Sequence, residues 1–353
     1  MAKRKDRPKD GPTEDLSVHE LIDGPTEVIS ADALAAFRAG GSGPDASVEA
    51  THDLSAYATT DLSAHAAPAA RARVELPRMP APGALYRRAL RDAVPVIGRS
   101  RRPDAPPEVE LAVGGVTVDR AHLADYDRVC GFRLSDRLPA TYPHVMGFPL
   151  SLRLMTTPEF PIALTGVVHV GNRITVHRPI EAGETLDFVT HAEHLRPHER
   201  GRQVDVVLVG SVGGEEVWRG VSTYLGKERT PDGGGRRDRG ERPAPPAATA
   251  RWRVEPRVGT DYARVSGDHN PIHTSRLGAR LLGFPRPIAH GMWSKARCLA
   301  ALESRLPEAY TVDVAFKLPV PLPGTVAFSA TPAWDFALHD ARTGRPHLVG
   351  AVR

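Results

Sequence analysis

A repeated six-residue motif constrains most strongly how this 353-residue chain can fold. Residues 126–131 read YDRVCG and residues 262–267 read YARVSG, so four of six positions are identical at an offset of 136. A second motif follows in each copy, HVM at 144–146 and HGM at 290–292. Both copies then carry alternating valines, in VHVGNRITV and VDVAFKLPV. Three motifs in the same order predict one structural unit present twice, with a chance repeat of short motifs as the alternative.

The same order of elements is expected in each copy: a loop, a helix and then strands. The period-2 runs VDVVLVGSV and VWRGVSTYL meet at Gly213-Gly214, which predicts two antiparallel strands and their turn. A further strand is expected from Phe328 to Leu338, turning back at Thr343-Gly344. A long helix followed by an antiparallel sheet that wraps it predicts an α+β unit.

Composition predicts the organisation of the rest of the chain. The first 75 residues are rich in Ala, Asp, Ser, Thr, Pro and Gly, with almost no aromatic residues, so they bury too little apolar area to offset the entropy of ordering. Residues 227–249 have the composition of a flexible connector, with the sequence KERTPDGGGRRDRGERPAPPAAT. We therefore expect a disordered tail (1–75), a linker with a short helix at 83–94 (76–107), a first folded unit (108–226), a flexible linker (227–249) and a second folded unit (250–353).

Charge and cysteine usage argue against several classes of protein. The net charge is +4 with Lys and Arg scattered along the chain, so no nucleic-acid-binding surface is indicated. Cys130 and Cys298 lack the spacing of a disulfide framework or a zinc site. The chain has no apolar run of about 18 residues and no apolar segment after its charged start, so we expect neither export nor a membrane span, and a cytoplasmic location.

The two copies differ in the segment between the two motifs. From Tyr to His the first copy has 18 residues and the second 28, so the first is ten residues shorter. With Gly131 laid on Gly267, three residues of the first copy, Phe132, Leu134 and Arg137, fall at Asp268, Asn270 and His273 of the second. Only the second copy therefore has an acid, an amide and an imidazole in this segment.

The spacing of these groups suggests acid–base chemistry. Asn270-Pro271 favours an extended or turn conformation before the proline, so Asp268 and His273 lie on either side of a bend and can converge. A helix that begins at Gly291 would offer free backbone amides to a developing oxyanion. Together these groups suit proton removal beside a carbonyl, coupled to movement of water. The alternative is that Asp268 and Asn270 only form turns and His273 only caps a helix.

The stretch YARVSGDHNPIH, followed by GFPRPIAHGM, resembles the hydratase motif of the MaoC-like, R-specific enoyl-thioester hydratase/dehydratase family. The resemblance is close over 262–292 and looser from about 108 onward. It implies an α+β double hotdog: two units, each a long central helix wrapped by an antiparallel sheet. The central helix of the second unit is expected at about 291–304. The unit at 108–226 would be a degenerate N-terminal hotdog, and 250–353 the catalytic C-terminal one.

The resemblance also implies a hydro-lyase of fatty-acid or related lipid metabolism. Such an enzyme adds water reversibly to a trans-2-enoyl thioester and forms the (3R)-3-hydroxyacyl thioester. Asp268 and His273 match the catalytic dyad of the family. Four residues are expected to orient the dyad or to hold the thioester carbonyl: Asn270, Gly291, Ser266 and His290. No metal and no redox cofactor is implied, because the CoA or phosphopantetheine arm belongs to the substrate.

The expected partners are an acyl-CoA or acyl-ACP substrate and the acyl carrier protein itself. Arg286, Lys295 and Lys317 are candidate contacts to a pantetheine phosphate or an acidic carrier protein, with a solvated surface as the alternative. The first unit is expected to supply room for the acyl chain, with His144 structural. A double unit fits a monomer or a homodimer. A hotdog thioesterase and a non-catalytic acyl-thioester-binding protein remain the alternative functions.

Overall fold

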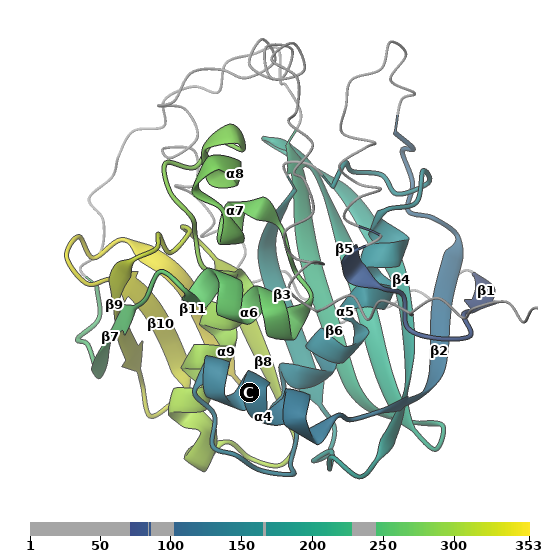
Figure 1. Cartoon of the computed structure of the whole chain (residues 1–353), viewed down its shortest axis with the longest axis horizontal. Helices are drawn as coiled ribbons and strands as arrows, with labels where there is room; N and C mark the ends of the chain where they lie inside the picture. The colour runs from purple at the N-terminus through teal and green to yellow at the C-terminus, as the bar shows by residue number, and fades with distance from the viewer. Residues whose placement is uncertain (1–70, 84, 86–101, 165–166, 228–244) are drawn as a thin grey trace, which may run out of the picture. The chain divides into compact units, whose positions relative to one another are not determined.

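The computed structural model of the chain describes residues 71–83, 85, 102–164, 167–227 and 245–353 (Figure 1). All of these belong to one unit of the chain, Pro44–Arg353. Three predictions lie largely or wholly outside the described residues: the disordered tail up to residue 70, the short helix at 83–94 and the connector at 228–244. No helix in the described part of the chain is long and apolar enough to cross a bilayer.

Each copy of the six-residue motif ends a helix in the structure. The two helices are α4 (Arg120–Cys130) and α6 (Val258–Ser266). Gly131 (φ 82°) and Gly267 (φ 71°) follow them in the left-handed conformation, which glycine adopts without steric cost at a helix C-terminus. Tyr126 and Tyr262 are buried, with ring centroids 6.3 Å apart. The motif therefore encodes the same helix end and the same packing tyrosine twice.

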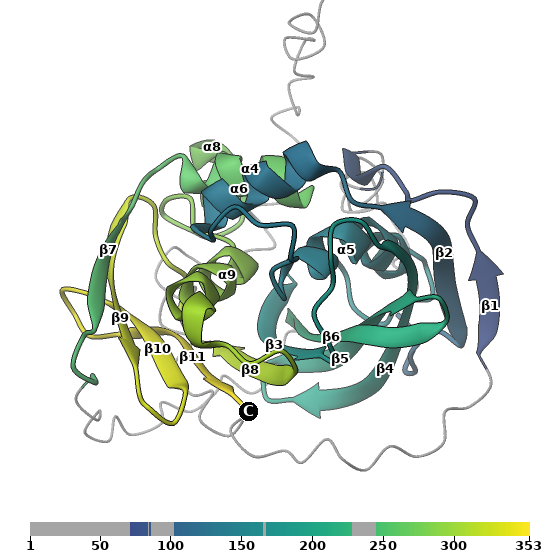
Figure 2. The same ribbon diagram turned by 90° about the horizontal axis from the view of Figure 1, so that it is seen from below.

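One antiparallel sheet, edged by one parallel strand, runs through both units (Figures 1 and 2). Its strands in the described part of the chain are β1 (Ala72–Glu75), β2 (Val109–Thr117), β3 (Val168–Val176), β4 (Thr185–His198), β5 (Gly201–Val212), β6 (Glu215–Lys227), β7 (Ala250–Val254), β8 (Tyr310–Phe316), β9 (Gly324–Ala330), β10 (Asp335–Asp340) and β11 (Pro346–Val352). Apart from β1, the order reads β2-β4-β5-β6-β3 and then β8-β11-β10-β9-β7. The second set has the equivalent strands in the reverse order. The two sets join where β3 pairs antiparallel with β8.

A central helix lies inside the curve of each set of strands (Figure 2). These helices are α5 (Tyr142–Met155) and α9 (Gly291–Leu302), and α9 continues as the 3₁₀ turn η2 (Glu303–Arg305). In β3 and β8, buried residues alternate with more exposed ones, because successive side chains of a strand point to opposite faces. The inward residues pack on the helices, so the predicted α+β double hotdog is confirmed.

The predicted turns are partly right. Gly213 (φ 60°) and Gly214 (φ 86°) join β5 to β6 as predicted, in a tight hairpin turn that requires positive φ at both positions. The predicted single strand from Phe328 to Leu338 is wrong, because β9 ends at Ala330 and β10 begins at Asp335. Pro332 lies in the gap, and proline lacks the N–H that a strand interior requires.

The prediction of disorder up to residue 75 is wrong for residues 72–75, which form β1. This strand pairs parallel with β2, and all four of its residues are exposed. Backbone hydrogen bonds from Ala72 N–H to Glu108 O (3.0 Å) and from Leu76 N–H to Ala112 O (2.8 Å) flank the pairing. Hydrogen bonding to the open edge of β2, and not apolar burial, orders this segment. The composition of residues 72–75 therefore did not indicate a strand.

Candidate active site

Asp268 directly follows the left-handed glycine that ends α6. Its backbone N–H donates to Ser266 Oγ (3.2 Å), and its Oδ1 accepts from the Asn270 N–H (3.2 Å). The side chain is 28% exposed, in contrast to the more deeply buried histidines beside it. Asp268 is thus oriented by its neighbours and still accessible to a ligand.

Asn270 forms the predicted bend and caps the short helix α7 (Pro271–Thr274). Its Oδ1 accepts from the Ile272 N–H (3.3 Å), and Pro271 occupies the first helical position. The side chain therefore has a turn-forming role, as the alternative interpretation held, while the backbone N–H of the same residue holds Asp268. Ser275 then caps α8 (Arg276–Leu281) by accepting from the Gly278 N–H (3.1 Å).

His273 lies on α7 and is buried, with its Nδ1 2.8 Å from the carbonyl oxygen of Ile288. A carbonyl only accepts, so Nδ1 carries the hydrogen, and the neutral imidazole keeps a lone pair on Nε2. Burial lowers the pKa of His273, although the negative charge of Asp268 opposes the shift. His273 is therefore held as a neutral base with its basic nitrogen defined.

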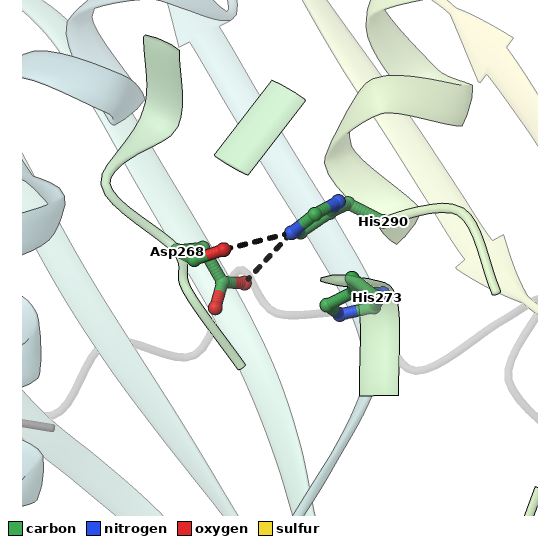
Figure 3. Close-up of side chains that lie close together, drawn as sticks. All are labelled: Asp268, His273 and His290. Atoms are coloured by element: carbon green, nitrogen blue, oxygen red, sulfur yellow. Dashed lines mark hydrogen bonds and ion pairs between the residues drawn. The ribbon is translucent and has the colours of Figure 1, made fainter. Parts of the chain in front are cut away.

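His290, expected only to support the site, lies at its centre (Figure 3). Its Nε2 donates to the backbone oxygen of Asp268 (3.0 Å) and lies 3.8 Å from Asp268 Oδ2. Its ring stacks on that of His273, with centroids 3.6 Å apart. Burial, with a smaller contribution from His273, lowers the pKa of His290 to about 3, so the imidazole is neutral and its contact with Asp268 is not an ion pair. The repeated HxM motif marked this residue but not its contact with Asp268.

The same three side chains also lie close enough together to be compared with a metal site. One donor atom from each of Asp268, His273 and His290 lies within 4.8 Å of the others. However, the His290 Nε2 that faces Asp268 donates to a backbone carbonyl, so it has no lone pair to offer a metal in that tautomer. The donor set as arranged suits proton transfer better than metal binding.

Gly291 is the first residue of α9, as predicted. The N–H groups of this first turn have no partner within the helix, and they carry its positive dipole end. A Cβ at this position would lie 3.1 Å from the ring of Phe316, the last residue of β8. Glycine therefore lets the aromatic ring lie directly against the helix start.

The predicted basic contacts lie outside the cluster of Asp268, His273 and His290. Arg286 is exposed between α8 and α9. Lys317 is partly buried directly after β8, and its N–H donates to His347 O (2.8 Å). The expectation for Lys295 is wrong: the residue is fully buried, because α9 directs this side chain toward the sheet.

Comparison with known proteins agrees with this geometry. A model described as "MaoC like domain" matches residues 243–333, which include the whole cluster. The 3-hydroxyacyl-thioester dehydratase X of Mycobacterium tuberculosis is 38% identical over 270 residues, which are 75% of this chain and 95% of the relative. The chain belongs to the MaoC-like dehydratase family.

The dehydratase X of Mycobacterium tuberculosis, HtdX, also has a solved structure. The crystal structure of HtdX from Mycobacterium tuberculosis matches with a TM-score of 0.62 and 37% identity, covering 69% of this chain and 99% of that one. The peroxisomal enoyl-CoA hydratase 2 of Arabidopsis thaliana is 39% identical over 57 residues, 16% of this chain and 18% of the relative.

Proposed function

We propose that this MaoC-like dehydratase is a hydro-lyase that interconverts (3R)-3-hydroxyacyl and trans-2-enoyl thioesters in fatty-acid or related lipid metabolism. The observation that carries the proposal is the convergence of Asp268 with a neutral, tautomerically defined His273 across the Asn270-Pro271 bend. The names of the relatives from Mycobacterium tuberculosis and Arabidopsis thaliana support the same reaction.

In the dehydration direction, the lone pair of His273 Nε2 takes a proton from C2 of the substrate. The electrons form the C2=C3 bond as the C3–O bond breaks, and the imidazolium returns the proton to the departing hydroxyl, which leaves as water. Asp268 accepts a hydrogen bond from that hydroxyl and stabilises the imidazolium. Because the elimination is syn, one imidazole serves both carbons from one face. The Gly291 N–H donates to the thioester oxygen, on which negative charge develops.

The proposed reaction needs no metal and no redox cofactor. The thioester arm comes with the substrate, as acyl-CoA or as an acyl carrier protein. Arg286 and Lys317 are proposed to contact the phosphates of that arm, because one lies in the segment leading to His290 and the other follows Phe316, whose ring lies against Gly291.

The test follows the ultraviolet absorbance of the enoyl thioester with crotonyl-CoA and trans-2-decenoyl-CoA. We expect wild type to consume both, and His273→Ala and Asp268→Asn to lose roughly 10²–10⁴-fold in kcat, the range for removal of an acid–base group. His177→Gln, at a partly exposed histidine outside the cluster, should keep the wild-type rate. Full activity in a folded Asp268→Asn variant, or release of free thiol by wild type without hydration, would contradict the proposal.

A further inference from the structure

A β-bulge in the first unit turns His169 toward the inner face of the sheet. Along β3 and β6, Asn172 pairs with Ser222, and both are buried. The register shifts between His169 and Gly171, so that His169 pairs with Tyr224. Tyr224 lies two residues from Ser222 and therefore on the same face, and cross-strand partners share a face. Without the extra residue, the His169 side chain would point outward; bulges redirect side chains in this way.

Turned inward, His169 lies at the junction of the two units. Its ring stacks on Tyr224 with centroids 4.7 Å apart, and it lies 5.0 Å from the ring of Phe316 in the second unit. Phe316 is the ring against which Gly291 lies. One aromatic ring therefore separates His169 from the proposed binding site of the thioester carbonyl.

A buried polar network holds the strands that carry these three rings in place. Lys295 Nζ, from α9, donates to Asn172 Oδ1 (2.6 Å), to Asn172 O (3.1 Å) and to Val312 O (3.2 Å). Asn172 Nδ2 in turn donates to Ser222 Oγ (3.1 Å), which is two residues from Tyr224. The network ties the helix that begins at Gly291 to the strand immediately beside the bulge.

The Nε2 of His169 is buried and makes no hydrogen bond among the described residues. Burial, with the charges of His144 and Lys295, lowers the pKa of His169 to about 3, against the opposing charge of Asp268 and a backbone hydrogen bond to Gly171. A backbone group that raises this pKa accepts from the ring, so we assign the hydrogen to Nδ1, and the neutral ring then keeps its lone pair on Nε2. An unpaired buried polar atom costs about 1–3 kcal/mol, and a ligand that donates to it removes that cost.

We propose that His169 is a substrate-binding residue supplied by the first unit, and that its Nε2 accepts a hydrogen bond from a donor group of the acyl thioester. The donor that fits is an amide N–H of the pantetheine arm, because the C3 hydroxyl of the substrate has one hydrogen and donates it to Asp268 in the proposed reaction. The proposal rests on the proposed function and extends it, since the first unit then contributes a specific contact in addition to room for the acyl chain.

The test uses His169→Phe, which keeps a ring between Tyr224 and Phe316 and removes the acceptor. We expect the KM for (3R)-3-hydroxybutyryl-CoA to rise about 10-fold, the scale of one hydrogen bond, with kcat changed less than about 3-fold. The thermal midpoint should stay level or rise, because the variant no longer buries an unpaired nitrogen. An unchanged KM would overturn the proposal, whatever happens to the thermal midpoint.

His347→Phe is the matched control. His347 is also buried with an unpartnered Nε2 and its Nδ1 3.1 Å from a backbone carbonyl, but its charged neighbours are Asp340 and His339. Its KM should match wild type, and a rise equal to that of His169→Phe would show a nonspecific effect and overturn the assignment.

Calorimetric binding of butyryl-CoA, which has no hydroxyl and does not react, separates the remaining outcomes. Weaker binding of butyryl-CoA by His169→Phe supports the amide N–H as the donor, because this ligand keeps the pantetheine amides, whereas a loss confined to the hydroxyacyl thioester would contradict that assignment. Wild type that binds butyryl-CoA but neither hydrates crotonyl-CoA nor dehydrates (3R)-3-hydroxybutyryl-CoA contradicts the proposed function alone. Identical butyryl-CoA binding by wild type and variant, with equal hydroxyacyl affinity, contradicts the role of His169.

Discussion

The two units share their scaffold and differ in the segment that leads into the central helix. In the first, ten residues separate Gly131 from the start of α5 at Tyr142. In the second, the corresponding segment carries Asp268, two short helices and a further loop before α9. Strand order and helix ends are retained because each unit must bury its own core, whereas the segment at the rim of the sheet is free to differ. The two units thus share a scaffold, while the cluster of Asp268, His273 and His290 lies in the second unit.

The central helices also differ position by position. In the first unit the HxM motif lies inside α5, which starts at Tyr142 with Pro143 in its first turn. In the second unit the histidine of the motif occupies the N-cap position of α9. Counted from this motif, Val145 and Pro149 of α5 correspond to Gly291 and Lys295 of α9. The second helix therefore has a glycine at its start and a buried lysine one turn later, at positions where the first helix has valine and proline.

The largest loss of stability is expected on substitution of Lys295, because this residue of α9 in the second unit donates to Asn172 of β3 in the first. Lys295→Met keeps the length of the side chain but leaves three buried acceptors on Asn172 and Val312 without their donor. We expect the free energy of unfolding to fall by about 3–5 kcal/mol, because each buried acceptor left without a donor costs about 1–3 kcal/mol. Urea denaturation measures this, with the exposed Arg280→Met changing stability by less than about 0.5 kcal/mol. A variant as stable as wild type would show that the units do not depend on this joint.

Gly291→Ala tests the second difference between the helices. The new Cβ would press on Phe316 and displace the helix start by a few tenths of an ångström, so kcat/KM should fall by roughly 10–100-fold while stability changes by less than about 1 kcal/mol. Val145→Ala, at the corresponding position of α5, should show the reverse: a loss of about 1–3 kcal/mol of stability from a buried side chain, with kcat/KM retained. Equal kinetic effects in both variants would argue against a special role for the start of α9.

The smallest expected effect concerns Asp127, which corresponds to Ala263 in the repeated motif. Both carboxyl oxygens are buried without a hydrogen-bond partner among the described residues. Burial, and secondarily the charge of Glu303, raises the pKa of Asp127 to about 7. The folded chain therefore binds this proton more tightly than the unfolded chain does, so stability falls as pH rises from about 4 to 7.

Asp127→Asn removes this titration. We expect the thermal stability of the variant, relative to wild type, to improve between pH 5 and pH 8 by the equivalent of about 1–2 kcal/mol. The exposed Asp125→Asn serves as the control and should follow the wild-type profile. A wild-type stability that does not decline over this range would contradict the inferred burial of charge at Asp127.

Local sequence signals located much of the scaffold and part of the site. The repeat, the bend at Asn270-Pro271 and the start of α9 at Gly291 were all predicted, and so was the convergence of Asp268 with His273. The prediction failed where a segment depends on a distant partner, as β1 depends on the edge of β2.

The sequence by itself therefore determined the repeat, the helix ends, the hairpin turn and the acid–imidazole bend. These features depend on the backbone conformations open to glycine and proline within a few residues. Only the tertiary structure decided that His290 donates to Asp268, that Lys295 is buried against β3, and that a bulge turns His169 toward the second unit. Those contacts depend on strand register and on which surfaces meet across the two units, and no short stretch of sequence specifies them.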